Sequence, residues 1–85
     1  MTTRSEIHGM ITRTAARGEV THVIIVCDTF NHDDYPVPVM RGEDPREIAE
    51  RYDGKNMQRI MEVYSLTGTH SIESQLAEER AFHYD

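Results

Sequence analysis

One stretch of the sequence decides the fold, THVIIVCDTF (residues 21–30). The four residues from Val23 to Val26 are all apolar, and neighbouring residues of a strand point to opposite faces of a sheet. A strand over this stretch is therefore buried on both faces, which is typical of a central strand. We expect it to cover about residues 21–28.

The next apolar stretch is DYPVPVM (residues 34–40), in which apolar residues alternate with Pro36 and Pro38. Proline has no N–H group, and two prolines that lie two positions apart remove donors from the same side of a strand. That side cannot pair with another strand, so a strand over about residues 35–40 must lie at an edge. The polar residues 31–34 favour a turn that joins the two strands as a hairpin.

Three helices have recognisable start signals. Thr3, Asp44 and Ser71 are suitable N-cap residues, each before a segment with helical spacing of apolar residues. Gly18 and Gly54 are suitable stop residues for the first two helices. The third helix has the weaker apolar stripe, formed by Ile72, Leu76 and Phe82.

Residues 57–66 fit either a helix or a strand. We favour a strand over about residues 59–66, because the central strand needs a second partner and a two-stranded ribbon alone is only marginally stable. The sequence therefore predicts an α+β fold in the order α-β-β-α-β-α, with a three-stranded antiparallel sheet and flanking helices. The whole chain, residues 1–85, is expected to be one domain. We expect its last residues, 83–85, to fray unless a partner orders them.

Size and charge limit the possible functions. A chain of 85 residues buries only about 60–65% of the surface that its unfolded form exposes, and small chains often gain stability by self-association. We therefore expect a homo-oligomer, most simply a dimer. The net charge is −6, whereas a sequence-independent nucleic-acid binder is basic, so we expect no direct binding of DNA or RNA.

The single cysteine, Cys27, has no partner for an internal disulfide. The first residues lack the apolar core of a signal peptide, and no stretch approaches the length of a transmembrane helix. These features predict a protein of the reducing cytoplasm that has no membrane partner.

The residues with catalytic or metal-binding chemistry have simpler structural explanations. Asp28, His32, Asp33 and Asp34 are possible metal ligands around one turn, but the same residue types are selected by turn geometry alone. Cys27 is a possible nucleophile, but a free cysteine in a buried strand is usually inert. We therefore expect no metal, no cofactor and no catalytic residue.

Polar residues at the end of the central strand are better candidates for binding. In the predicted sheet, an antiparallel third strand starts beside the end of the first strand, which brings residues 56–59, part of the polar segment 53–59, close to Asp28. Arginine suits a phosphate or carboxylate, the tyrosine ring suits a planar group, and the amides suit polar edges. The expected ligand-binding residues are Asp28, Thr29, Tyr35, Arg41, Asn56, Gln58 and Arg59. Arg41 lies at the opposite end of the hairpin and would join the others only across a subunit interface.

Three segments resemble small, functionally unassigned proteins encoded by bacteriophages and prophages: VIIVCDTF (residues 23–30), DYPV (residues 34–37) and YDGKNMQRIMEVYSL (residues 52–66). The resemblance covers about residues 4–84 and carries no active-site motif. It implies a phage-type protein that acts on its host by binding.

Three functions remain open at this stage. The first is an oligomeric binding protein that sequesters a small anionic ligand, such as a nucleotide signal of antiviral immunity. The second is an inhibitor whose acidic surface blocks a basic host protein, although the acidic residues are interspersed with arginine. The third, a small hydrolase or metal enzyme that uses Asp28 and His32, has the least support, because no nucleophile and base have a recognisable spacing.

Overall fold

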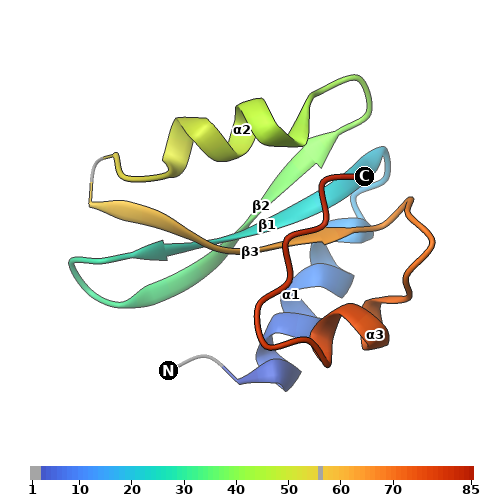
Figure 1. The fold of residues 1–85 in the computed structure, drawn as a ribbon, viewed down its shortest axis with the longest axis horizontal. Helices are drawn as coiled ribbons and strands as arrows, with labels where there is room; N and C mark the ends of the chain where they lie inside the picture. Colours follow the sequence, from blue (N-terminus) through green and yellow to red (C-terminus); the bar gives the residue numbers. More distant parts are fainter. Residues whose placement is uncertain (1–2, 56) are drawn as a thin grey trace.

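The computed structural model describes residues 3–55 and 57–85 and has the expected α+β fold. Its elements, in chain order, are α1 (Arg4–Ala15), β1 (Val20–Asp28), β2 (Asp33–Met40), α2 (Pro45–Tyr52), β3 (Gln58–Ser65) and α3 (Ile72–Leu76) (Figure 1). The order α-β-β-α-β-α and the strand assignment of residues 58–65 are confirmed. None of the described helices is long and apolar enough to cross a membrane.

The sheet has the strand order β2-β1-β3, with both neighbours antiparallel to β1. The central position of β1 and the edge position of β2 are therefore confirmed. Pro36 and Pro38 lie opposite Ile25 and Val23 of β1. Since β2 pairs with β1 alone, the missing N–H groups of the two prolines fall on the free side of the sheet.

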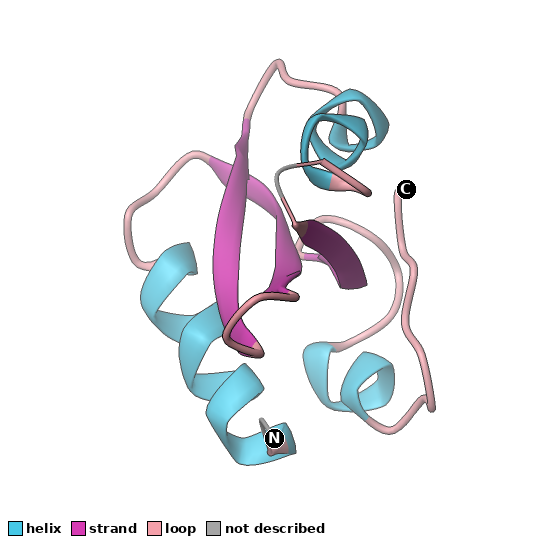
Figure 2. Cartoon of the chain, turned by 90° about the vertical axis from the view of Figure 1, so that its left-hand side faces the viewer, coloured by secondary structure: helices cyan, strands magenta, loops and turns pink. Residues whose placement is uncertain are grey.

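The two faces of β1 are covered by different parts of the chain. Val23 and Ile25 pack in a cluster with residues of α1, whereas Ile24 and Val26 pack in a second cluster with residues of α2. Figures 1 and 2 show the sheet between these helices. Residues 23–26 are at most 1% exposed, so the chain buries its most apolar strand without a second subunit.

The three helix starts follow the sequence signals. The Thr3 hydroxyl accepts the N–H of Glu6 at 3.1 Å, and Ser71 accepts the N–H of Ser74 in the same way. Asp44 caps α2 by accepting a backbone N–H through its carboxylate. Each cap satisfies an N–H group that has no partner within its own helix.

Two expectations about the C-terminal segment are wrong. Helix α3 ends at Leu76, and Phe82 lies in an extended segment rather than on the helix stripe. Residues 83–85 do not fray: the N–H of His83 donates to the C=O of Val63 at 3.0 Å, and the C=O of Asp85 accepts a hydrogen bond from the Ser65 hydroxyl at 2.8 Å. The outer edge of β3 supplies these partners, which lie about twenty residues away in the sequence.

Gln75 completes the same edge of β3 with its side chain. Its amide is fully buried, accepts the N–H of Ser65 at 2.8 Å and donates to the C=O of Ser65 at 2.9 Å. It also donates to the C=O of His70 at 3.1 Å. One side chain thus replaces a neighbouring strand at this position and ties α3 to the sheet.

We predict that Gln75→Leu, which replaces the buried amide by an apolar side chain of similar size, destabilises the protein by about 2–5 kcal/mol. The variant leaves the buried N–H and C=O of Ser65 without partners, each at about 1–3 kcal/mol. Urea unfolding measures the change, with the exposed neighbour Ser74→Ala as a control that should stay within about 0.5 kcal/mol of the parent. A Gln75→Leu variant as stable as the parent would show that this amide does not secure the edge.

We predict that the double variant Pro36→Thr/Pro38→Thr self-associates more strongly than the parent. The change restores two N–H donors on the free side of β2, and exposed donors invite pairing between edges of two molecules. Sedimentation velocity at micromolar concentration measures the association. Pro45→Thr, which makes the same chemical change at the start of α2, is the control. A double variant as monodisperse as the parent contradicts the protective role of the prolines.

Candidate functional site

Polar groups join the ends of β1 and β3. Thr29 donates both its N–H and its hydroxyl to the C=O of Met57, each at 2.7 Å. The Asp28 carboxylate accepts the N–H of Phe30 at 2.9 Å, and the Asp28 C=O accepts the N–H of His32 at 2.7 Å. The expected proximity of the two strand ends is therefore present, but Asp28 and Thr29 use their polar atoms to hold the loops.

Tyr35 and Gln58 also lie together. The Gln58 amide donates to the Tyr35 hydroxyl, and both side chains are half-buried. Burial is the main reason that the pKa of Tyr35 is raised, and the neighbouring Tyr52 raises it further. The phenol stays neutral at physiological pH. The Tyr35 hydroxyl and the Gln58 amide are hydrogen-bonded to each other.

Arg41 is not brought to this end of the sheet. It follows β2 at the opposite end, where its guanidinium forms an exposed ion pair with Glu19 at 2.9 Å. Asn56, the remaining predicted amide, lies outside the described residues. Of the predicted binding residues that the structure describes, Arg59 is the one that lines the two cavities considered next.

Arg59 and Arg80 line two cavities at once. Arg59 lies opposite Cys27 near the start of β3, and Arg80 comes from the extended C-terminal segment. Within residues 3–55 and 57–85, no carboxylate oxygen lies within 4.0 Å of either guanidinium. No carboxylate of these residues therefore competes with an external anion for the two cationic groups. The guanidinium carbon of Arg80 lies 5.3 Å from the centre of the Phe82 ring, a contact that uses the face of the guanidinium and not its N–H donors.

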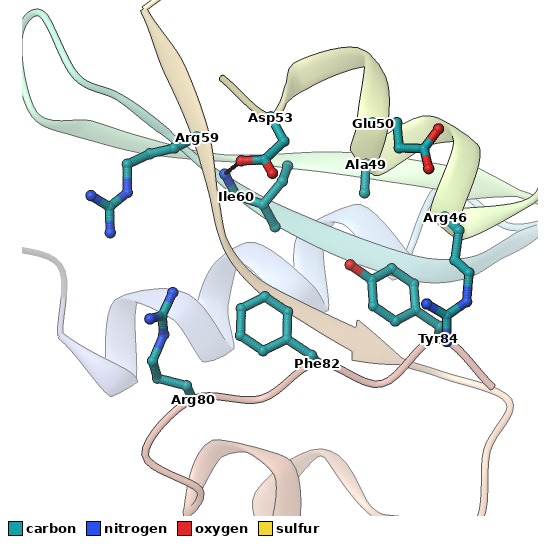
Figure 3. A pocket seen from close by; sticks show the side chains of 9 residues that line it. All are labelled: Arg46, Ala49, Glu50, Asp53, Arg59, Ile60, Arg80, Phe82 and Tyr84. Carbon is teal, nitrogen blue, oxygen red and sulfur yellow. Dashed lines mark hydrogen bonds between the residues drawn. The ribbon is translucent and has the colours of Figure 1, made fainter. Parts of the chain in front are cut away.

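The first cavity lies on the α2 face of the sheet and has a volume of about 440 Å³. Figure 3 shows the guanidinium groups of Arg59 and Arg80 at one end, with Phe82 beside Arg80 and Tyr84 farther along. The Arg46 guanidinium stacks 4.3 Å from the centre of the Tyr84 ring, and Phe82 is 43% exposed. The full lining comprises Arg46, Ala49, Glu50, Asp53, Arg59, Ile60, Arg80, Phe82 and Tyr84.

The second cavity lies on the α1 face and has a volume of about 560 Å³. Part of its wall is Met61, the residue that has no partner on β1 because the β1–β3 register shifts between Ile60 and Glu62. Its full lining comprises Arg4, Ile7, Ile25, Cys27, His32, Asp34, Arg59, Met61, Glu62, Glu79 and Arg80. The two cavities therefore lie on opposite faces of β3.

A buried carboxylate supports the wall between them. Glu62 is 7% exposed and accepts hydrogen bonds from the Tyr64 hydroxyl at 2.6 Å and from the N–H of Ala81 at 3.3 Å. The guanidinium of Arg4 lies 3.4 Å from the same carboxylate. The bond to Ala81 holds the C-terminal segment next to β3. Glu62 and Arg4 therefore have structural partners and are not ligand-binding candidates.

The metal and nucleophile alternatives gain no support from the geometry. Among residues 3–55 and 57–85, no group of three or more His, Cys, Asp or Glu side chains is arranged to hold a metal ion. The pKa of the Cys27 thiol is raised, first by burial and then by its hydrogen bond with Asp34. A nucleophilic cysteine needs the opposite shift.

Sequence reasoning missed Arg80, Phe82 and Tyr84. These residues alternate along the chain, and alternation is the pattern of an extended segment with one side facing a neighbouring surface. This alternation covers only three residues. The spacing of Ile72, Leu76 and Phe82 also fits a helix, and we therefore expected Phe82 on the third helix. Arg46 was missed because it lies on a helix surface, where arginine is common.

Comparisons of the chain with family models, with curated proteins and with solved structures found no match. The function must therefore be argued from this geometry.

We predict that Tyr64→Phe costs about 1–3 kcal/mol at pH 8, because the buried Glu62 carboxylate loses a donor. The pKa of Tyr64 is raised above its ordinary value of 10.0, mainly by burial and then by the hydrogen bond to Glu62. Above pH 10 the unfolded chain loses a proton that the folded parent keeps, so the stability of the parent falls as the pH rises.

The difference in stability between parent and variant should therefore shrink above pH 10. Urea unfolding at pH 8 and at pH 10.5 measures it. Two stability curves that run parallel across this range would contradict the buried Tyr64–Glu62 contact.

Proposed function

We propose that the chain is a non-enzymatic binding protein that holds a small anionic ligand between Arg59 and Arg80, with a nucleotide as the class that fits best. In the setting that the resemblance to phage-encoded proteins implies, such a protein sequesters a nucleotide signal of host immunity in the host cytoplasm. The observation that carries the proposal is that Arg59 and Arg80 line both cavities and form no ion pair within residues 3–55 and 57–85.

Charge chemistry supports an anion at this position. A guanidinium donates in a planar fork that matches phosphate and carboxylate oxygens, and charge-assisted hydrogen bonds are stronger than neutral ones. Although the whole chain carries a net charge of −6, the three arginines of the first cavity outnumber its two carboxylates, Glu50 and Asp53. The local charge therefore suits an anion even though the overall charge does not.

The aromatic side chains support a ligand with a planar group. Phe82 is exposed in the same cavity as the two arginines, and planar rings stack on aromatic faces with a contribution of about 1–3 kcal/mol per base. A nucleotide combines a phosphate with a planar base in one molecule. A simple inorganic anion would make no use of the exposed part of the Phe82 ring, whose centre lies 5.3 Å from the guanidinium carbon of Arg80.

We keep self-association in the proposal, now only because a second subunit could bring Arg41 to the site. The chain covers both faces of β1 by itself, so the apolar central strand no longer requires a second subunit. Arg41 joins the binding site only if a partner copy brings it there. Loss of binding in Arg41→Ala would indicate a site that is shared between subunits.

We predict that Arg59→Ala and Arg80→Ala each weaken nucleotide binding by about ten- to a hundredfold, because each removes a charge-assisted contact worth about 1.5–3 kcal/mol. Isothermal calorimetry with AMP, ADP and cyclic AMP measures the affinities at fixed salt concentration. Arg51→Ala, which removes the same charge from an exposed position of α2 outside both cavities, is the matched control.

The control should bind as the parent does, within about twofold. A parent that binds none of these nucleotides would remove the sequestering function. The acidic inhibitor of a basic host protein would then take its place, and capture of a host protein by the parent would be the next measurement.

A further inference from the structure

The two cavities lie on opposite faces of β3 and share two lining residues. Arg59 and Arg80 belong to both linings, while the remaining residues belong to one or the other. Ile60, on the first cavity, packs with the α2 cluster, and Ile25, on the second, packs with the α1 cluster. A ligand that contacts both arginines therefore lies at the edge of β3, with open space on each face of the sheet.

Each cavity is large enough for one arm of such a ligand. Their volumes of about 440 and 560 Å³ each fall within the range of about 300–1,000 Å³ that is typical of small-molecule sites. A single nucleotide would occupy one cavity and leave the other to water. Because Arg59 and Arg80 line both cavities, a ligand bound to them can extend into either one.

We propose that the ligand has two arms joined by a phosphate bridge, as in a dinucleoside diphosphate, with the bridge at Arg59 and Arg80 and one arm in each cavity. This inference rests on the function proposed above and specifies its ligand class. The bridge brings negative charge to the centre of the ligand, which would lie at the two guanidinium groups that line both cavities.

The linings differ in a way that suits two arms. The first cavity offers the rings of Phe82 and Tyr84, and the carboxylates Glu50 and Asp53 can accept from amino or hydroxyl groups. The second cavity offers the half-buried apolar side chain of Met61, with Asp34 and Glu79 as acceptors. Each end therefore combines a surface for a planar group with acceptors for the polar groups of a nucleoside.

Calorimetry with three probes tests the inference: diadenosine diphosphate, AMP and inorganic pyrophosphate. We expect diadenosine diphosphate to bind at least tenfold more tightly than AMP, and pyrophosphate more weakly than both. AMP binding within about twofold of diadenosine diphosphate would overturn the two-armed ligand while leaving the proposed function intact. Failure of all three probes to bind would remove the proposed function and this inference with it.

Alkylation of Cys27 reports on the second cavity without any substitution. Cys27 is the single cysteine of the chain and lines the second cavity but not the first. Intact mass after treatment with N-ethylmaleimide therefore measures its modification. The reaction is run at pH 8.5 because the pKa of the thiol is raised, and protein unfolded in urea gives the rate of the fully exposed thiol.

We expect saturating diadenosine diphosphate to slow the alkylation of Cys27 at least fivefold, and saturating pyrophosphate to change it by less than twofold. Equal rates with and without diadenosine diphosphate would overturn the arm in the second cavity. A Cys27 that does not react in the free protein would overturn it as well, because a cavity closed to a small reagent cannot admit a nucleoside.

Discussion

The backbone pairing between Val63 and the C-terminal segment is the interaction on which the candidate site depends. The N–H of Val63 donates to the C=O of Ala81 at 2.8 Å, and the N–H of His83 donates back to the C=O of Val63 at 3.0 Å. The outer edge of β3 would otherwise be open, and unpaired edges are costly or prone to association. Gln75 satisfies the same edge two residues farther on.

This pairing also decides which residues face each other. The C-terminal segment runs parallel to β3, so Arg80, which precedes Ala81, lies toward the start of β3, where Arg59 lies. The buried Glu62 holds this segment in place by accepting the N–H of Ala81. On the other side of the pairing, Phe82 and Tyr84 turn toward α2 and line the first cavity. A structural device that closes a sheet edge thus creates the wall shared by two cavities, which is why charge and aromatic surface occur together there.

Most of the fold could be predicted because it depends on local patterns. Four consecutive apolar residues made β1 central, the two prolines made β2 an edge, and the N-cap residues placed the helices. The site was only partly predictable. Arg59 was found because strand order placed it at a polar end, but Arg80 becomes its neighbour through pairing of segments some twenty residues apart. Residues such as Asp28 and Thr29 have the chemistry of ligand contacts, yet the loops use their hydrogen bonds, and only the three-dimensional structure distinguishes these roles.

Amide hydrogen exchange, followed residue by residue with NMR, tests the docking of the C-terminal segment most directly. Both N–H groups of the pairing, those of Val63 and His83, should exchange slowly, at rates comparable with the central strand β1. Exchange of these two amides as fast as that of the exposed turn residues Thr67 and Thr69 would show that the segment is not held against β3. The shared wall of the two cavities, and the place of Arg80 in both linings beside Arg59, would then not exist in solution.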